Sequence, residues 1–411
     1  MFRFAMKMAW ASLARRATRS LMVVLMISVS LWSLLLMQGV YDGMTEQMIN
    51  NAIRSDSGDV SLFRRGYRLD PSLENVIPDT FPDGRKVEDV LGMDGRVGSF
   101  VKRLQQNGVV ATARYSRNIM IYGVALAAEK KHGQLQRYLL TGHYGFGAKR
   151  KGAIVGYRLA ERLHVTVGSK LILSCQNSSS DVVSISVRVN GILKTNNMSF
   201  DEGSVFIDLD LAEDFFGVHQ GVSQISVMMN EGKDIGELQL ALQQSFPGLD
   251  VMRWDEMYPA LMQSRVIMNG FKSVVSLIIF GVSGLGILGV MMVSIIERRR
   301  EIGIMLALGT EFSQIRIMVL IESLIMGFSG FVAGSLLGWV SLLYFRSYGL
   351  DLSMFSEAFE EFGMDAVTYA LIQPGYFLSA FTAILSAAVI SVYFPLRIVS
   401  KVIPARIINE I

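Results

Sequence analysis

The residue types that most often carry enzyme chemistry are few in this sequence, and their spacing does not match the common catalytic sites. The four histidines, His132, His143, His164 and His219, form neither an HxxxH nor an HExxH pair, which argues against a zinc motif of that kind. Neither the phosphate-binding GxxxxGKS/T loop nor the GxSxG nucleophile motif occurs. The single cysteine, Cys175, excludes an internal disulfide and a multi-cysteine metal site. The chain is therefore predicted to be no enzyme and to bind no cofactor itself.

One glycine-rich segment matches a nucleotide-binding pattern by its letters alone. Residues Gly284 to Gly289 read GLGILG, which fits the GxGxxG pattern. That pattern binds a dinucleotide where it joins a strand to an amphipathic helix. Here it lies inside a long uncharged apolar stretch, where small residues let helices approach closely. We interpret it as a helix-packing feature.

The composition is that of a membrane protein. Of the 411 residues, 51% are hydrophobic and 18% are charged, whereas soluble proteins carry about a quarter charged residues. The net charge of +3 gives no reason to expect a nucleic-acid partner. Apolar segments long enough to span a bilayer as helices occur at 21–41, 273–296, 317–345 and 375–396.

The first apolar segment has an alternative interpretation as a secretory signal peptide, because a basic start before an apolar run fits both. No small-x-small cleavage site follows it, and the run is longer than the usual signal core. These features favour an uncleaved first span.

The distribution of Lys and Arg predicts the orientation of the chain. The basic N-terminus 1–20, the link 297–316 and the tail 397–411 are rich in these residues, whereas the connection 346–374 holds only Arg346. The positive-inside rule places the rich segments and both termini in the cytoplasm. The connection and the large block 42–272 then lie outside.

The block 42–272 is long enough for a core of its own and mixes strand and helix signals, so we predict a large α+β extracytoplasmic domain between the first two of four transmembrane helices. The alternation from Val183 to Val189 predicts a strand that ends in a tight turn at Asn190-Gly191. Further strands are expected at 204–208 and 224–229, helices at 157–164 and 233–246, and a long loop or hinge around 70–98.

The link between the second and third spans has a helical pattern. From Glu297 to Gly309 it reads ERRREIGIMLALG, with Ile302, Met305 and Leu306 on one side. A short amphipathic helix held between two spans can transmit motion between them. The alternative is an ordinary solvated loop helix.

The ends of this helix also carry signals. Arg298 and Glu301 can pair at i to i+3, and Gly309 stands where a C-terminal glycine cap belongs. Thr310 can then cap the next helix, with Glu311 at its positive end.

The third span carries two further features. Gly330, Gly334 and Gly338 repeat at four-residue spacing and predict a flat face that packs on another helix, within the chain or across a dimer. Glu322 is the only charge in this span, and we expect it to reach the interface or to pair with a basic group; a proton relay is the alternative.

The order of one span, a large outer domain and three spans, with EIGIMLALG after the second span, resembles the FtsX/MacB-type ABC transporter permeases. In that family the link contacts the ATPase and an acidic residue like Glu322 stands early in the third span. The segment 403–406, IPAR, resembles the family's ending. The resemblance implies ATPase-coupling roles for Arg300, Glu301, Ile302, Gly303, Met305, Leu308 and Gly309.

A narrower resemblance is to the lipoprotein-releasing permeases of the LolC/LolE type. It implies a bacterial inner-membrane subunit that couples ATP hydrolysis by a partner to extraction of lipoproteins. The partners implied are an ABC ATPase dimer that binds ATP and Mg, a second identical or paralogous permease chain, a lipoprotein and a periplasmic acceptor. Substrate acyl chains would enter near Val40, Tyr41, Ile267 and Phe271. The resemblance rests on the segments 43–44, 47–49, 51–54, 58, 66–67, 70–71, 121–124, 155–156, 159–160, 163, 165, 167–168 and 189–192, with 76–98 as an insertion.

Two other functions fit the same sequence pattern. One is an FtsX/MacB-like permease that exports a peptide or drug, or that activates a cell-wall hydrolase by mechanotransmission. The other is a non-transporting membrane receptor, although the cytoplasmic segments are too short to hold a signalling domain.

Overall fold

The computed structural model describes residues 17–133, 135–147, 150–195, 198–355 and 367–399. The chain forms two compact units, each assembled from segments that are distant in sequence. The helical unit contains residues up to Met44, Arg265–Asp351 and the residues from Val367 onwards. The sheet-rich unit contains Thr45–Ser264 and Leu352–Ala366.

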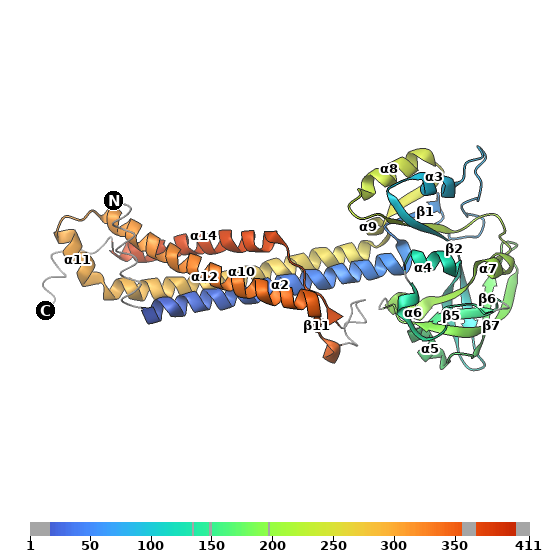
Figure 1. Ribbon diagram of the computed structural model, residues 1–411, viewed down its shortest axis with the longest axis horizontal. Coiled ribbons are helices and arrows are strands. Elements are labelled where there is room, and N and C mark those ends of the chain that lie inside the picture. Colours follow the sequence, from blue (N-terminus) through green and yellow to red (C-terminus); the bar gives the residue numbers. More distant parts are fainter. Residues whose placement is uncertain (1–16, 134, 148–149, 196–197, 356–366, 400–411) are drawn as a thin grey trace. The chain divides into compact units, whose positions relative to one another are not determined.

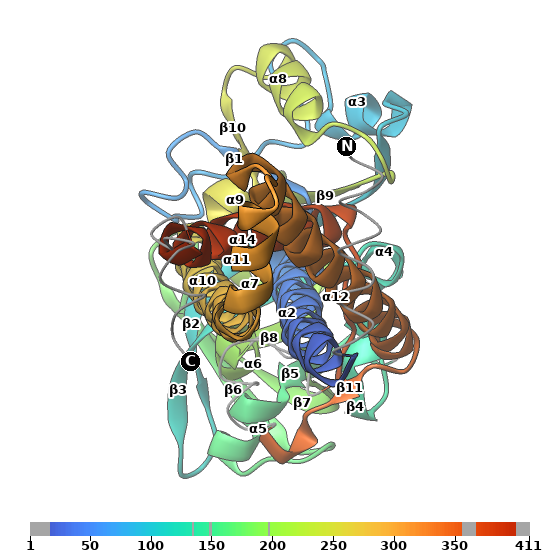
Figure 2. The same ribbon diagram turned by 90° about the vertical axis from the view of Figure 1, so that its left-hand side faces the viewer.

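Among the described residues, four helices are long and apolar enough to cross a membrane. They are α2 (Ala17–Ala52), α10 (Pro259–Glu297), α12 (Phe312–Tyr348) and α14 (Pro374–Val399). Their membrane segments lie side by side (Figures 1 and 2). The short helix α11 (Arg299–Ala307) joins α10 to α12, and β11 (Leu350–Asp351), η3 (Ser353–Phe355) and β12 (Val367–Thr368) lie between α12 and α14. The predicted fold class is confirmed, and α2 and α10 continue as helices beyond the predicted spans 21–41 and 273–296.

The helices of the bundle differ in how far they are buried. Half of the most apolar window of α12 is buried, against 17% of that of α10. Burial of α12 follows from its glycines, which leave room for the neighbouring backbone. The bundle core joins α2, α10, α11, α12 and α14 through Leu34, Leu35, Met291, Ile302, Val319, Leu342, Ala380 and Val392, among others.

The sheet-rich unit is built on one ten-stranded sheet in the order β10-β1-β9-β2-β3-β8-β5-β7-β4, with β6 pairing β2 and β7. The fifteen-residue strand β2 pairs with β9 through its first part and with β3 and β6 through its last part. The strands are β1 (Val60–Arg64), β2 (Val97–Ala111), β3 (Ser116–Val124), β4 (Leu139–Gly142), β5 (Gly152–Gly156), β6 (Lys170–Gln176), β7 (Val182–Leu193), β8 (Ser204–Asp208), β9 (Gln224–Met229) and β10 (Leu249–Arg253).

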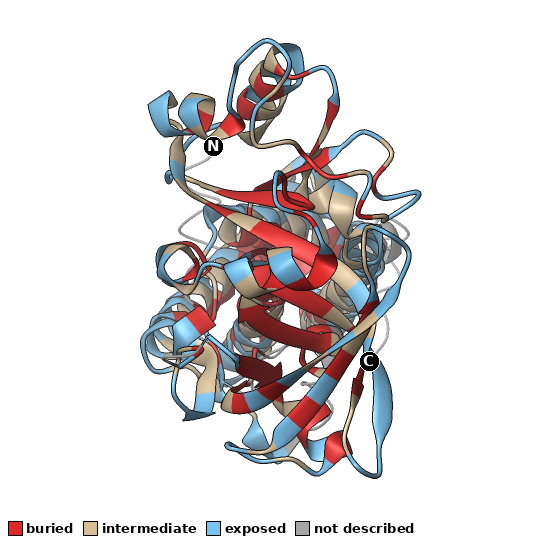
Figure 3. Ribbon diagram, turned by 90° about the vertical axis from the view of Figure 1, so that its right-hand side faces the viewer, coloured by how far each residue is buried: buried red, intermediate tan, exposed pale blue. Residues whose placement is uncertain are grey.

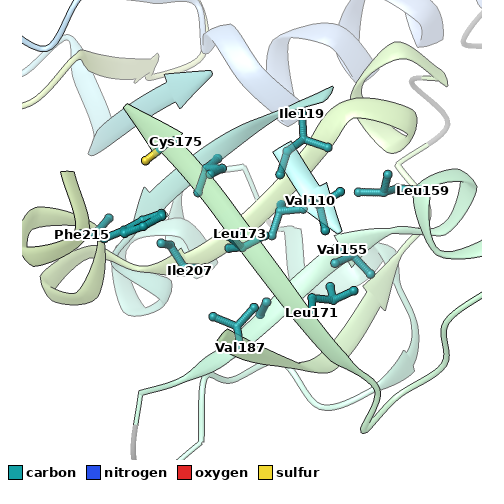
Figure 4. Close-up of a cluster of buried hydrophobic side chains, with 14 of the residues drawn as sticks. Val110, Ile119, Val155, Leu159, Leu171, Leu173, Cys175, Val187, Ile207 and Phe215 are labelled. Carbon is teal, nitrogen blue, oxygen red and sulfur yellow. The ribbon is translucent and has the colours of Figure 1, made fainter. Parts of the chain in front are cut away.

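Because β6 pairs with both β2 and β7, the strands β2-β3-β8-β5-β7-β6 close on themselves as a barrel. Inward residues of these strands form a continuous apolar core (Figure 4). Closure removes free strand edges at this point, which protects the sheet from pairing with other chains. Leu171, Leu173 and Val187 are fully or almost fully buried in that core.

The remaining part of the sheet, β10-β1-β9 and the start of β2, packs on two helices. Alternate residues of β1 and β9, such as Leu62 and Val227, form a second core with Leu238 and Leu242 of α8 and with Phe246, which directly follows α8. Figure 3 shows the buried residues along the central strands and the exposed residues on outer surfaces. The helical elements of this unit are η1 (Ile53–Ser57), α3 (Val87–Met93), α4 (Leu126–Lys131), η2 (Leu135–Tyr138), α5 (Tyr157–Leu163), α6 (Met198–Gly203), α7 (Leu209–Phe216), α8 (Ile235–Ser245) and α9 (Trp254–Met257).

Most local predictions for this unit agree with the structure. The strands expected at 204–208 and 224–229 are β8 and β9, and the helices expected at 157–164 and 233–246 are α5 and α8. The predicted loop at 70–98 is wrong in part, since it contains α3 and the start of β2.

The turn predicted at Asn190-Gly191 is also wrong, because β7 continues through it to Leu193. The register of β5 with β7 shifts there: Ala153 opposes Val189 and Ile154 opposes Gly191. Asn190 is thus an extra residue in the strand. Its side-chain amide donates to the Gly145 carbonyl at 2.9 Å, so tertiary contacts replace the turn.

Candidate coupling site and polar helix contacts

The link between the second and third spans forms the helix α11, which is bound to the bundle by its apolar face. Ile302 is 2% exposed and belongs to the bundle core, and Met305 and Leu306 pack against that core. Gly303 is also buried. Burial of this face fixes α11 against the helices that it connects.

The opposite face of α11 is open. Arg300 and Glu301 are exposed, and so is Gly309 at the end of the helix. Ile304 is 48% and Leu308 81% exposed. The predicted coupling residues therefore lie on two faces of α11. One face packs against the helix bundle, and the other exposes charged and apolar side chains that a partner protein can contact.

The helix ends at the predicted glycine. Gly309 has a positive φ of 91°, which favours glycine. Its N–H donates to the Leu306 carbonyl and the Thr310 N–H donates to the Met305 carbonyl, at 3.1 and 3.0 Å. These two bonds make a Schellman cap. The expectation for the next helix is wrong, because the residue before α12 is Glu311, not Thr310.

A buried ion pair joins the start of α11 to α12. Arg298 Nη1 lies 3.2 Å from Glu322 Oε2, and the two residues are only 8% and 5% exposed. Arg298 Nε also lies 3.4 Å from Glu301 Oε2 in the predicted i to i+3 pair. The expected basic partner of Glu322 is thus Arg298. The i to i+3 spacing predicted the contact of Arg298 with Glu301, whereas Glu322 is 24 residues from Arg298 and no local spacing indicates that pair.

The glycine face of α12 packs on α2 within the same chain. A Cβ atom added to Gly330 or Gly338 would come within 2.7 Å of Ile27 or 2.6 Å of Leu35. One added to Gly334 would lie 2.8 Å from the Ser28 carbonyl oxygen. The matching signal in α2 is the four-residue spacing of Ile27, Leu31 and Leu35, all of them buried.

A second polar contact lies at the end of the bundle opposite α11. Lys272 Nζ of α10 is 2.7 Å from Asp42 Oδ1 of α2, and the Tyr376 hydroxyl of α14 donates to Asp42 Oδ2 at 2.5 Å. The Asp42 carboxylate on α2 therefore links α2 to both α10 and α14. Asp42 and Lys272 are the first and last residues of the predicted outer domain, 42–272. Their opposite charges at the ends of two spans are the sequence feature from which this ion pair could have been predicted.

This contact continues one helical turn further into the bundle. Gln38, four residues before Asp42, donates from Nε2 to Ser276 Oγ, four residues after Lys272, at 3.5 Å. The Gln38 Oε1 atom is buried and has no hydrogen-bond partner among the described residues. Asp42–Lys272 and Gln38–Ser276 form an antiparallel polar ladder between α2 and α10.

The proposed substrate-access residues do not share one environment. Val40 of α2 packs against the bundle core, and Tyr41 is half-buried. Ile267 and Phe271 of α10 are 64% and 60% exposed. The two α10 residues lie on an open apolar face that continues along the helix through Val274.

The sheet-rich unit holds a separate buried ionic cluster where the chain leaves α2. Arg103 of β2 and Glu129 of α4 are both fully buried, with Arg103 Nε 2.6 Å from Glu129 Oε1. Arg103 Nη1 also donates to the Asp56 carbonyl of η1 at 2.5 Å. The Tyr258 hydroxyl, just before α10, donates to Asp56 Oδ2 at 2.7 Å. The segment that follows α2 and the residue that precedes α10 are thus both bound to the Arg103–Glu129–Asp56 cluster.

His132 lies beside this cluster in an uncharged state. Its ring nitrogens are 3.2 Å from Ser99 Oγ and 2.9 Å from Ser226 Oγ. Burial, together with the positive charge of Arg103, lowers the pKa of His132 from 6.5 to about 3. The imidazole is therefore neutral at physiological pH.

The architecture is that of a membrane protein with four candidate spans among its described residues and a large sheet-rich domain between the first two. Residues 20–245 match the MacB-like periplasmic core domain, and residues 273–404 match the FtsX-like permease C-terminal domain. The chain therefore belongs to the FtsX/MacB-type ABC transporter permeases.

Two curated relatives illustrate the range of similarity. A probable export ATP-binding/permease protein MacB of Pseudomonas entomophila is 23% identical over 378 residues, covering 86% of this chain and 54% of that protein. An uncharacterized ABC transporter permease of Methanocaldococcus jannaschii is 34% identical over 157 residues, covering 37% and 39%. The chain spans about half the length of these relatives or less. Among solved structures, the periplasmic region of MacB from Actinobacillus actinomycetemcomitans matches 51% of this chain and 95% of its own at 12% identity, with a TM-score of 0.34.

Proposed function

We propose that this permease couples ATP hydrolysis by a partner ATPase to extraction of lipoproteins from the bacterial inner membrane. It would work with a second permease chain, identical or paralogous, and with both termini in the cytoplasm. The segments on which the terminal positions rest, 1–16 and 400–411, lie outside the described residues. A periplasmic acceptor would receive the released lipoprotein.

The observation that carries the coupling step is the division of α11 into two faces. A push on the open face, where Ile304 and Leu308 are exposed, reaches the bundle through Ile302 and through the Arg298–Glu322 pair. An apolar pair surrounded by charged groups is a suitable docking surface for a protein. ATP and Mg would be bound by that partner, not by this chain.

The cargo assignment is supported by the open apolar face of α10. Ile267 and Phe271 are exposed along a helix that has few buried residues, so acyl chains in the bilayer can reach it. The energetic demand suits an ATP-driven machine, because each buried CH₂ group contributes about 0.8 kcal/mol and a long acyl chain therefore about 10 kcal/mol. Access between α2 and α10 requires the polar ladder of Asp42 and Lys272 to open.

A second candidate cargo is a small molecule or peptide. Relatives of this chain carry the name macrolide export ATP-binding/permease protein MacB. An exporter of that kind would use the same α11 coupling. Mechanotransmission to a cell-wall hydrolase is the third outcome that the same architecture supports.

The coupling step can be tested with Leu308→Asp in the full-length protein, purified from native membranes in mild detergent. We expect wild-type protein to retain an ABC ATPase and this variant to lose it. The matched control is Leu240→Asp, which makes the same substitution at a leucine of α8 that is also largely exposed, at 62%. Retention of the ATPase by the Leu308 variant would refute docking at α11. Gly303→Pro, or charge reversal at Arg300 and Glu301, should leave the protein inserted but uncouple transport from ATP hydrolysis.

The cargo is tested separately by reconstitution of the permease and its ATPase in proteoliposomes that contain an acylated lipoprotein. ATP-dependent appearance of the lipoprotein in the soluble fraction supports the assignment. ATP-dependent movement of a macrolide or peptide, with no lipoprotein release, assigns the exporter function instead.

A further inference from the structure

The barrel of the sheet-rich unit has an open outer face formed by β2, β6 and β7. In β6 and β7 the inward residues Leu171, Leu173 and Val187 enter the core, as Figure 4 shows, so the alternate residues point outward. Two of these outward residues are large and apolar: Ile172 is 45% and Val182 81% exposed. We call the outward side of these three strands the β6–β7 face.

Positive charge gathers at one end of the β6–β7 face. Lys170 of β6 stands directly opposite Arg188 of β7, and both are exposed. Lys151 lies on the other side of Arg188, just before its β5 partner Gly152. In the described part of the chain, none of these three cations has a carboxylate within 4.0 Å, and Arg188 Nη1 donates to the Gly168 carbonyl at 3.1 Å.

Like charges opposite each other on neighbouring strands are destabilising. Electrostatic repulsion between Lys170 and Arg188 therefore destabilises the free protein. An anionic group bound over the two side chains would remove this repulsion. This identifies the chemistry that the charged end of the face would recognise.

The other end of the face contains a hollow of about 440 Å³. Its lining combines the exposed apolar side chains of Val109 and Val182 with the polar Asn107 and Gln176. It forms where β2 pairs with β3 and β6 at once. Gly108 is required there, because a Cβ atom would come within 2.6 Å of the Ser174 carbonyl oxygen.

We propose that the β6–β7 face binds an extended polypeptide segment that carries an acidic residue at one end and an apolar side chain at the other. The acidic residue would contact Lys170 and Arg188, and the apolar side chain would enter the hollow beside Val182. Along β6 the two ends are separated by roughly 20 Å at about 3.3 Å per residue, which an extended segment of about seven residues spans.

The distribution of side chains favours a polypeptide over an anionic lipid surface. A lipid surface would be met by cations spread around an apolar patch. Here the cations stand at one end, and the middle of the face carries the small hydroxyls of Ser174 and Ser184, which hydrogen-bond to each other at 2.8 Å. The proposal goes beyond the transport function and holds for any cargo.

The test is a selection of random twelve-residue peptides on the full-length permease in uncharged nanodiscs. We expect enriched peptides to share an acidic residue about six positions from an apolar one, and to bind more weakly at high salt. Lys170→Glu should weaken their binding at least tenfold, as should Val182→Asp. Lys233→Glu, at an exposed lysine two residues before α8, should leave the Kd unchanged.

A thermal melt separates recognition from folding. Lys170→Glu replaces a like-charge pair by an opposite-charge pair with Arg188, so its Tm should be equal to or higher than that of wild type. Binding lost together with a lowered Tm would overturn the proposal. So would a selection that yields no acidic-apolar pattern, peptides that bind the Lys170 variant equally well, or phosphatidylglycerol vesicles that displace the peptides.

Discussion

Replacing Glu322 by alanine would remove a buried carboxylate that contacts Arg298, a residue only 8% exposed between α11 and α12. Breaking a buried ion pair by removing one partner costs about 3–5 kcal/mol. Glu301 has a side chain that is 60% exposed, and such pairs contribute only about 0.2–1 kcal/mol. We therefore expect Glu322→Ala to lower the free energy of unfolding several times more than Glu301→Ala does.

The double variant Arg298→Met, Glu322→Met is the decisive comparison. Replacing a buried pair by apolar side chains is often neutral or stabilising, so the double variant should be more stable than either single variant. The non-additivity should reach about 3 kcal/mol, at the upper end of what contacting residues show. It is measured for the full-length protein by reversible SDS unfolding in mixed micelles, followed by tryptophan fluorescence in a Trp254→Phe background, so that the signal of the described residues comes from Trp32 and Trp339 of the bundle.

The same variants separate stability from coupling. If the pair transmits motion from α11, the double variant will be stable but its partner ATPase will no longer respond to substrate. Additive effects of the two single changes would refute the buried pair. A stable double variant with wild-type transport would refute its role in coupling.

Other parts of the chain give independent predictions. Asp42→Lys or Lys272→Asp alone should lower the detergent Tm, and the combined exchange should restore most of it; no restoration would argue against the ion pair. Gly334→Val should lower the Tm because its side chain meets the α2 backbone, whereas Gly281→Val, with nothing within 4 Å of its Cβ position, should not; equal effects would contradict the packing. His132 has a depressed pKa, so its stabilising neutral state is fully present above about pH 6.5 and is progressively lost as the pH falls toward 3, by roughly 1.4 kcal/mol per unit. Hydrogen exchange of β9 peptides should show this loss, and His132→Gln should flatten it; an unchanged pH profile would count against a buried neutral ring.

The features predicted best from the sequence are those encoded locally. The amphipathic pattern around Ile302 identified α11, and the need for a positive φ identified the glycine cap at Gly309. Spacing alone identified the packing face at Gly334 but not its partner, because several apolar helices offered suitable surfaces. The structure supplies α2 as that partner.

Features that depend on distant residues were missed. Arg103 follows a lysine in a strand and gives no local sign of burial, yet its carboxylate partner Glu129 is 26 residues away and both are fully buried. The prediction of a turn at Asn190-Gly191 was wrong for the same reason: the conformation there depends on residues distant in sequence. A register shift between β5 and β7 placed this pair inside a strand, where contacts with the loop before β5 decide its conformation.

The pairing of β1 has a consequence for how the protein is made. Its only strand partners in the described residues are β9 and β10, which begin at Gln224 and Leu249. β1 ends at Arg64, so 160 positions separate it from the first residue of β9. At about 5–20 residues per second, synthesis of that distance takes roughly 8–32 s. During that interval the apolar Val60 and Leu62 have neither of these partner strands to cover them, so β1 stays exposed in the nascent chain until β9 has been made.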